Sequence, residues 1–443
     1  MPALTIRRVR NKSRQLVRKG IRRTAPARAA LRSGLRRTPL PTPVRVAASK
    51  VLLRRPWSVT VPVEKLLLGP QNARDFTAAQ FAGEIGDLMW PSTPVADGPH
   101  VALLRLADKL GDDLTDGEIL DSAYGSMAAH CIRTQGRYFG ATDPAGVLTV
   151  ARSFIDRYRG APGSTGSGHS RAGDPILVAP IKGSDHYQVL DGHHRIALAI
   201  ARGARTVRVT AKWMPVTTPL QDLLTKMSWL DGDRQLYQPL PAPELRLSWP
   251  TVRRCTDRLE KMTAFLDDRK LLPPATSSYL DVASCYGWFV KEMSRLGYDA
   301  NGMDRDPLAP PLGHAAYGLD EDVVQIGDCV ELLRNAGRTW DVVSCFSLLH
   351  HFALGRGAVD EKELIRLLDA ATGAVLFFDT GQDHEQWFAE SLRGWDTAGV
   401  AAFLREHTTF DEIIDLGPDA DSVPPHERNY GRHLFACVRT PKN

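Results

Sequence analysis

Residues 279–306 read YLDVASCYGWFVKEMSRLGYDANGMDRD, and this stretch decides the fold of the C-terminal half. Its first four residues form a predicted short strand that carries Asp281 near its end. A turn of small residues follows at 283–287, then a predicted helix, and then a second short strand that ends on Asp304. A unit of this kind places backbone N–H groups and a helix N-terminus beside a ligand. The carboxylate at the next strand end is suited to a ribose diol.

The segment resembles the first motif of class I S-adenosylmethionine-dependent methyltransferases, which reads roughly D-x-G-x-G-x-G. Residues 281–287 read DVASCYG, so only the last family glycine is kept. The resemblance implies a binding site for S-adenosylmethionine formed by Asp281, Ala283, Ser284, Cys285, Gly287, Asp304 and Asp328, the last lying where the family places the acid that contacts the adenine amino group. Alanine and serine add little bulk, so we expect binding to survive if φ stays negative at the substituted positions.

Three later segments continue this resemblance in the expected order. Residues 339–352, TWDVVSCFSLLHHF, resemble the family's fourth strand, and residues 373–379 resemble the fifth. Residues 430–439, YGRHLFACVR, read as a closing strand that should pair antiparallel at the edge of the sheet. Alternating strands and helices predict an α/β fold, a doubly wound Rossmann-like methyltransferase sheet with an antiparallel closing strand.

The resemblance implies methyl transfer, in which the cofactor already carries the activated group and the protein aligns the acceptor. An alcohol acceptor also needs a general base, and we expect His351 to serve, followed by Asp379 and then His350. The alternative is that the two histidines only frame the pocket. No N-P-P-Y segment follows the fourth strand, which argues against amino methylation of DNA bases or protein glutamine. A hydroxyl on a small molecule or glycan is therefore the predicted acceptor.

A second motif lies in the N-terminal half. Residues 187–213, YQVLDGHHRIALAIARGARTVRVTAKW, resemble the ParB/sulfiredoxin superfamily, which implies an α+β domain that binds a nucleotide. A helix N-terminus favours phosphate, so the predicted nucleotide or phosphate site is Asp191, Gly192, His193, His194 and Arg195, with ATP or another nucleotide as ligand. The alternative is that the motif only holds a turn.

Superfamily members that act as small-molecule kinases share this D-G-H-H-R sequence and need a carboxylate base after the first strand. Residues 69–72 read GPQN here, and Glu64 is the nearest acid. A sulfiredoxin would have cysteine in place of His193, and a chromosome-partitioning protein would continue into a helix-turn-helix. A bifunctional kinase and methyltransferase is thus the first alternative function. A nucleotide-gated DNA-binding or scaffold protein with a degenerate methyltransferase domain is the second.

The charge distribution separates the start of the chain from the rest. Residues 1–63 hold 17 Lys and Arg and no Asp or Glu, so the net charge of +5 leaves −12 on residues 64–443. Residues 5–23 have the spacing of a basic amphipathic helix, which would favour an anionic membrane surface, whereas a solvated tail is the alternative. The acidic body makes nucleic acid an unlikely partner.

The length of 443 residues predicts more than one domain. We expect a basic, flexible tail at 1–56, the ParB/sulfiredoxin-like domain at 57–213 with a helical insertion at about 75–160, a connector at 214–275, and the methyltransferase domain at 276–443. Six cysteines without a C-x-x-C pair predict no metal site and a reducing compartment. The expected location is the bacterial cytoplasm, with peripheral contact to the inner face of the membrane through the basic tail.

Overall fold

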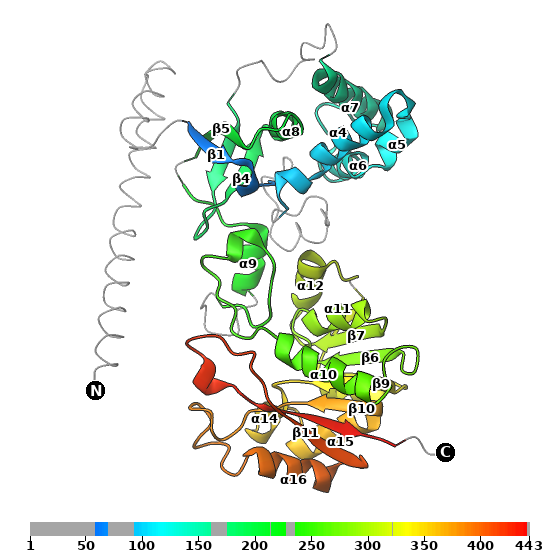
Figure 1. Ribbon diagram of the computed structural model, residues 1–443, viewed down its shortest axis with the longest axis vertical. Helices are drawn as coiled ribbons and strands as arrows, with labels where there is room; N and C mark the ends of the chain where they lie inside the picture. The colour runs from blue at the N-terminus through cyan, green and yellow to red at the C-terminus, as the bar shows by residue number, and fades with distance from the viewer. Residues whose placement is uncertain are drawn as a thin grey trace, which may run out of the picture.

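The computed structural model describes residues 58–69, 93–160, 175–212, 214–226, 235–320 and 322–440. The expected basic tail at 1–56, with its predicted helix at 5–23, lies outside the described residues. Figure 1 shows a small sheet and a group of helices in one half of the molecule and a larger sheet in the other. Helix α9 (Pro219–Lys226) lies between the two halves (Figure 1).

The N-terminal half contains a five-stranded mixed sheet with the order β1-β5-β3-β4-β2. Its strands are β1 (Val59–Pro62), β2 (Leu66–Leu67), β3 (Leu177–Pro180), β4 (Tyr187–Asp191) and β5 (Thr206–Ala211). Strand β5 pairs antiparallel with β1 and parallel with β3, and β3 pairs antiparallel with β4. Helix α8 (His193–Ala201) follows β4 after a single glycine. This is a mixed α and β arrangement, as expected from the sequence.

The described residues between β2 and β3 include four α-helices. They are α4 (Pro99–Leu110), α5 (Asp116–Asp121), α6 (Ala123–Gln135) and α7 (Pro144–Arg159). Side chains cap three of them at the N-terminus: Thr115 begins α5, Ser122 begins α6 and Asp143 begins α7. Their apolar faces form one core cluster that continues into the segment after α9, through Leu236 and Leu240. The insertion and the connector are therefore packed together.

The C-terminal half contains a seven-stranded sheet with the order β11-β12-β10-β9-β6-β7-β8. Its strands are β6 (Ser278–Val282), β7 (Asp299–Asp304), β8 (Val324–Ile326), β9 (Trp340–Cys345), β10 (Thr372–Phe378), β11 (Glu412–Pro418) and β12 (His433–Val438). The five strands from β10 to β8 run parallel, and β12 pairs antiparallel with β10. The antiparallel pairing of the closing strand is confirmed.

The closing strand does not lie at the sheet edge, which corrects one expectation. Strand β11 pairs antiparallel with the outer side of β12 and so takes the edge position itself. The residues of β11 are mostly half-buried, whereas five of the six residues in β12 are buried. A strand enclosed on both sides carries the continuous apolar run that residues 434–438 show, and an edge strand does not need one.

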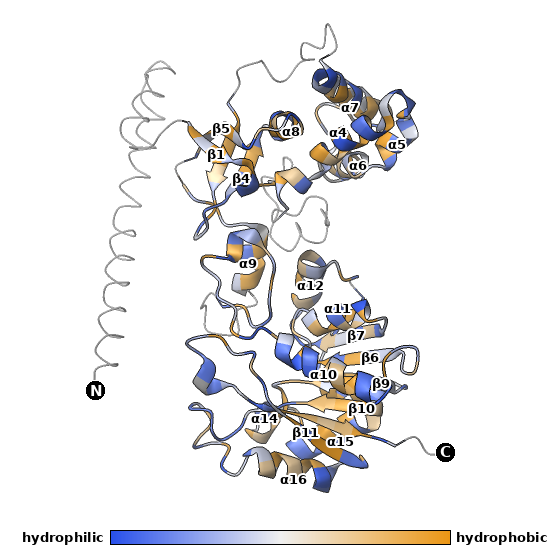
Figure 2. Cartoon of the chain, viewed as in Figure 1, coloured by the Kyte–Doolittle hydropathy of each residue, from blue (hydrophilic) through white to orange (hydrophobic). Residues whose placement is uncertain are grey.

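Helices cover both faces of this sheet. The helices are α10 (Thr256–Asp268), α11 (Trp288–Arg295), α12 (Ala309–Tyr317), α13 (Cys329–Asn335), α14 (Leu349–Ala353), α15 (Glu361–Ala371) and α16 (Thr397–His407). Residues of α10 to α12 pack in one cluster with the sheet, and residues of α13 to α16 pack in a separate cluster. The strands between them are the most hydrophobic part of the half in Figure 2. Helix α10, expected in the connector, thus belongs to the C-terminal layer.

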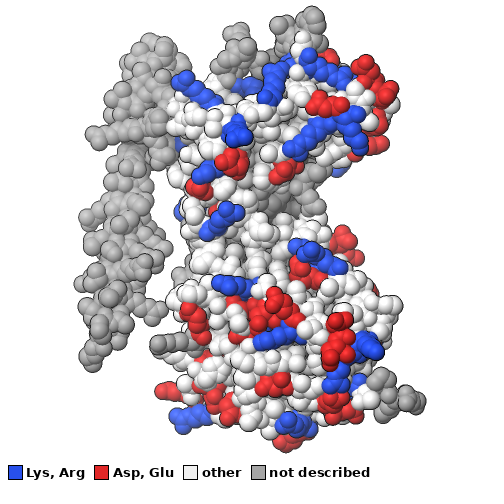
Figure 3. All heavy atoms as spheres, viewed as in Figure 1, with Lys and Arg blue, Asp and Glu red and all other residues white. Residues whose placement is uncertain are grey.

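The visible face carries positive and negative side chains interspersed over both halves, with mostly uncharged atoms between them (Figure 3). Among the described residues, no helix combines the length and apolar character needed to cross a bilayer.

Candidate functional site

The carboxyl ends of the parallel strands bring together residues that are far apart in the sequence. In parallel α/β sheets, ligands bind at the carboxyl ends of the strands. The turn at 283–287 follows β6, Asp304 ends β7, and Asp328 follows β8. Ser347 follows β9, and Asp379 follows β10. The candidate cofactor and catalytic residues therefore lie together at the carboxyl ends of the parallel strands.

The turn after β6 keeps a left-handed backbone although it has lost glycines. Ala283 has φ of 61°, Cys285 has φ of 56°, and Gly287 has φ of 85°. The condition set for binding to survive, a negative φ where the family glycines are replaced, is therefore not met at Ala283 and Cys285. A side chain in this region costs roughly 1–2 kcal/mol per residue, because Cβ crowds the following carbonyl oxygen. The turn geometry of a glycine-rich motif is thus retained against its local preference.

Asp304 holds this turn from the neighbouring strand. Its Oδ2 accepts a hydrogen bond from the N–H of Cys285 at 2.8 Å, and its Oδ1 accepts one from the N–H of Asp306 at 2.9 Å. Burial raises the pKa of Asp304, although both N–H donors lower it in part. The residue is only half-buried, and each carboxylate oxygen has a second lone pair. The carboxylate can therefore accept a further hydrogen bond from a ligand hydroxyl.

Asp328 lies on the next strand end and begins α13. Its Oδ1 accepts hydrogen bonds from the N–H groups of Val330 at 2.9 Å and Glu331 at 3.4 Å. The side chain is exposed. The N–H of Gly327 donates to the carbonyl of Asp304, which ties the two loops together. The second carboxylate oxygen of Asp328 can therefore face a ligand while the first caps the helix.

Asp281 lies in a different position from the one expected. Its side chain is 2% exposed, and its Oδ1 accepts a hydrogen bond of 2.6 Å from Ser344 Oγ on β9. Burial raises the pKa of this carboxyl to about 7. Asp281 thus links β6 to β9 inside the sheet layer, and its carboxylate is not available at the surface.

The expected catalytic histidines differ in exposure. His350 is buried, and its Nδ1 accepts a hydrogen bond of 3.1 Å from the N–H of Gly381, while burial lowers its pKa to about 2. His351 is half-buried, and its ring is tilted at 38° to that of His350, with the ring centroids 4.3 Å apart. Burial, followed by the charges of Arg356 and Arg305, lowers the pKa of His351. A neutral, accessible imidazole is left at this position, and it can accept a proton.

Asp379 is held in a buried ionic network. Its Oδ2 lies 3.3 Å from Arg253 Nη2 and 3.2 Å from Arg258 Nη1, and its Oδ1 accepts the N–H of Ser347 at 2.7 Å. Burial alone would raise its pKa, but the neighbouring arginines lower the pKa of Asp379 to about 2. A carboxylate so strongly stabilised in its charged form is a poor proton acceptor. Its position favours a role in holding the loops after β9 and β10.

The other members of this network come from distant segments. Arg253 Nη2 also binds Asp419 Oδ2 at 2.7 Å, Arg258 Nε binds Asp421 Oδ2 at 2.9 Å, and Arg432 makes two contacts with Glu385 at 2.8 and 2.9 Å. Both Arg253 and Arg432 donate to Ser347 Oγ, at 2.8 and 2.7 Å. The sequence gives no local signal for these residues, because the partners lie up to 166 positions apart.

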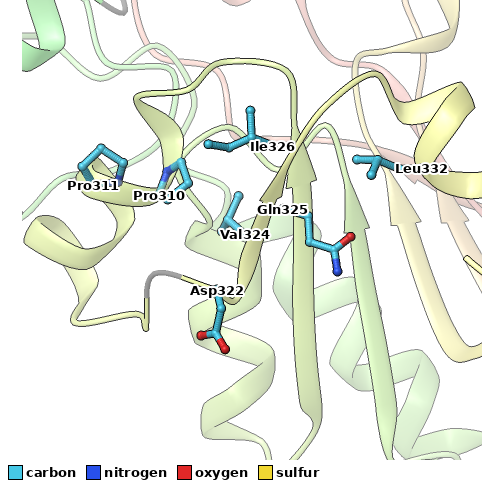
Figure 4. Close-up of a pocket in the computed structure, with 7 residues that line it drawn as sticks. All are labelled: Pro310, Pro311, Asp322, Val324, Gln325, Ile326 and Leu332. Carbon is cyan, nitrogen blue, oxygen red and sulfur yellow. The ribbon is translucent and has the colours of Figure 1, made fainter.

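A cavity of about 720 Å³ lies at the open side of strand β8. It is lined by Pro310, Pro311, Asp322, Val324, Gln325, Ile326 and Leu332 (Figure 4). None of the predicted cofactor or catalytic residues lines it. The cavity is therefore separate from Asp304, Asp328 and the turn after β6.

The D-G-H-H-R turn in the N-terminal half has a different arrangement. Gly192 begins α8 with φ of 101°, and Arg195 Nη2 pairs with Asp191 Oδ2 at 2.9 Å. His193 and His194 are buried, and burial lowers the pKa of each to about 3. The N–H of Gly69 donates to His193, and Tyr124 of the insertion lies 2.8 Å from His194. The imidazoles therefore lie among protein groups, away from the solvent side where a phosphate was expected to meet them.

Comparison with known proteins gives only distant structural neighbours. No protein-family model matches the chain, and no curated protein matches it. Among solved structures, the bifunctional kinase-methyltransferase WbdD is 18% identical, with a TM-score of 0.39 over 49% of this chain and 46% of WbdD. Magnesium protoporphyrin IX methyltransferase from Synechocystis PCC 6803, solved with bound SAM, is 15% identical, with a TM-score of 0.30 over 41% of this chain and 78% of that protein.

The matched region is thus less than half of the WbdD chain. The structural neighbours include S-adenosylmethionine-dependent methyltransferases. The fold assignment itself rests on the strand order and direction described above.

Proposed function

We propose that the C-terminal half binds S-adenosylmethionine and transfers its methyl group to a hydroxyl of a small molecule or glycan. The observation that carries this proposal is the arrangement of Asp304. Its half-buried carboxylate lies at the end of a parallel strand and is hydrogen-bonded to a left-handed turn at a helix N-terminus. Such a carboxylate suits a ribose diol, and Asp328 on the next strand suits an adenine amino group.

The residues at the carboxyl ends of the strands have distinct roles in this proposal. The bound sulfonium supplies an activated methyl group together with its leaving group. Asp304 and Asp328 orient the nucleoside. His351 accepts the proton of the acceptor hydroxyl as the new carbon–oxygen bond forms, because its imidazole is neutral and accessible. Asp379 and the buried arginines fix the loop that carries Ser347.

Calorimetric titration of the full chain with S-adenosylmethionine tests the cofactor site. We expect the wild type to bind and Asp304→Asn to weaken binding by at least about tenfold, since a buried hydrogen bond to a charged group contributes about 1.5–3 kcal/mol. Asp299→Asn, at the opposite end of the same strand, is the matched control and should bind normally. Equal affinity of Asp304→Asn and the wild type would place the site elsewhere.

The role of His351 needs an activity measurement. Methyl transfer to a panel of hydroxyl compounds should be lost in His351→Gln while cofactor affinity stays unchanged. Retained transfer in this variant would assign the proton to another group.

The N-terminal turn is proposed to bind the phosphate of a nucleotide through Arg195 and the backbone N–H groups at the start of α8. The left-handed Gly192 and the helix N-terminus support this proposal. Titration with ATP, ADP and CTP tests it, with Arg195→Met as the variant expected to bind more weakly. Transfer of labelled phosphate from ATP to a hydroxyl compound in the same mixtures would support the bifunctional alternative.

A further inference from the structure

The connector residue Gln238 contacts the turn that follows β6. Its position in the sequence gives no indication of this contact. Its side chain is buried, with 3% exposed. Its Nε2 donates to the carbonyl of Ser284 at 3.1 Å, and its Oε1 accepts the N–H of Trp288 at 3.2 Å. One amide group thus joins the middle of the turn to the first residue of α11.

The backbone of Gln238 is bound to the same turn. Its N–H donates to the hydroxyl oxygen of Tyr286 at 3.1 Å, and its carbonyl accepts the hydroxyl proton of Tyr286 at 2.7 Å. The next residue, Pro239, accepts a hydrogen bond from Tyr317 of α12. The connector is therefore fastened to the turn by both main chain and side chain.

The conformation of the turn explains why such contacts are needed. Ala283 and Cys285 adopt left-handed φ values that glycine would adopt freely. Asp304 holds the turn on the side of β7, through the N–H of Cys285. Gln238 holds it from the connector, through the carbonyl of Ser284. Asp304 and Gln238 together constrain the turn. With glycine at positions 283 and 285 the turn would not need this constraint.

We propose that Gln238 is a positioning residue that keeps the turn in its cofactor-binding conformation. This inference rests on the proposed function, because it assumes that the turn binds S-adenosylmethionine. Gln238 is itself anchored outside the C-terminal sheet. Its neighbours Leu236 and Leu240 belong to the core cluster that contains Tyr286 and the helical insertion. The connector, which packs against the helical insertion, therefore contributes directly to the geometry of this turn.

Titration of the full chain with S-adenosylhomocysteine tests the proposal. Gln238→Ala should weaken binding by about tenfold or more, because two left-handed non-glycine residues lose their support. Adding Ala283→Gly and Cys285→Gly to this variant should restore affinity to within about threefold of the wild type, since glycine adopts the conformation without help. Gln238→Glu should bind at least as weakly as Gln238→Ala, because its buried carboxylate has no hydrogen to donate to the Ser284 carbonyl and repels that oxygen.

Gln221→Ala is the matched control for loss of a buried glutamine. Gln221 is also 3% exposed, and its Nε2 donates to the carbonyl of Lys182, far from the turn. This variant should lower the melting temperature and leave the affinity unchanged. The proposal is overturned if Gln238→Ala binds as tightly as the wild type, or if its loss of affinity is not restored by the two glycines.

Amide hydrogen exchange of residues 283–288 supplies a readout that needs no ligand. Gln238→Ala should speed exchange in this segment by about tenfold, whereas Gln221→Ala should not. If the wild type fails to bind S-adenosylhomocysteine, the proposed function fails. Unchanged exchange in Gln238→Ala shows that Gln238 does not hold the turn, so the two failures are distinguishable.

Discussion

Two strand–turn–helix units, one in each half of the molecule, begin their helices with a left-handed glycine and differ in what surrounds it. In the N-terminal unit, Gly192 is followed by two histidines that are buried beneath the helical insertion. In the C-terminal unit, Gly287 follows a turn that contacts Asp304 and Gln238. The N-terminal unit contains the whole D-G-H-H-R pattern, yet its two histidine side chains are enclosed. The C-terminal unit lacks two of the three glycines of the D-x-G-x-G-x-G pattern, yet its turn keeps a left-handed backbone. Motif agreement and site geometry are therefore separate properties.

The largest expected effect concerns the ionic network beneath the C-terminal turn. Arg253→Ala removes the arginine that pairs with both Asp379 and Asp419 in the buried network, although Asp379 keeps Arg258, so we expect the free energy of unfolding to fall by about 3–5 kcal/mol. Urea unfolding measures this change. The surface pair of Arg269 and Glu412 is the control, and Arg269→Ala should have little effect because water screens that pair. Equal effects of the two variants would show that the network does not stabilise this half.

The two buried histidines of the N-terminal unit should make the free energy of unfolding fall as the pH is lowered. Their folded-state pKa of about 3 lies below the ordinary 6.5, so the unfolded chain binds protons first as the pH drops. The contribution is present above pH 6.5 and is lost as the pH falls toward 3, by about 2 kcal/mol per histidine at pH 5.

Unfolding curves between pH 7.5 and 5 measure this loss. The decline should be shallower in His194→Gln than in the wild type, because one of the two groups is removed. An equally steep decline in that variant would mean that His194 is already accessible to protons in the folded protein.

The smallest expected effect is the difference between replacing Gly287 and replacing Gly192 by alanine. Alanine at either position costs roughly 1–2 kcal/mol for the left-handed conformation. Gly287→Ala should exceed Gly192→Ala, since its added Cβ would lie 2.7 Å from a Leu319 methyl, against 3.1 Å from Arg195 Nη2 at Gly192. Gly203, with φ of 83° and open space around it, is the control for conformation alone. Thermal unfolding of the three variants measures these effects. A larger loss of stability in Gly192→Ala than in Gly287→Ala would contradict the expectation.

Much of the fold followed from the sequence because its signals are local. Residues 339–352 predicted a strand that the structure places at Trp340–Cys345, and residues 373–379 predicted one found at Thr372–Phe378. Continuous apolar runs and short turns are sufficient for such assignments. Strand β11 was missed, because EIIDLGP has half-buried residues and no strong pattern.

The site was predictable only in part. The position of Asp304 at a strand end followed from the alternation of strands and helices. The burial of Asp281 did not, because it depends on Ser344 in a strand 63 residues away. The roles of Gln238 and Arg253 had no sequence signal, since each acts through partners brought together by folding.

The sequence by itself determined the order of strands and helices, the two glycine-begun helices and the carboxylates at the strand ends, because these depend on residues near one another in the chain. Tertiary structure alone decided which of these groups are buried and which stay accessible at the strand ends. Packing of the insertion encloses His193 and His194, and the connector holds Ala283 and Cys285 in a conformation that their own backbone preferences disfavour. Burial and hydrogen bonding between distant segments set both outcomes, and no local pattern encodes them.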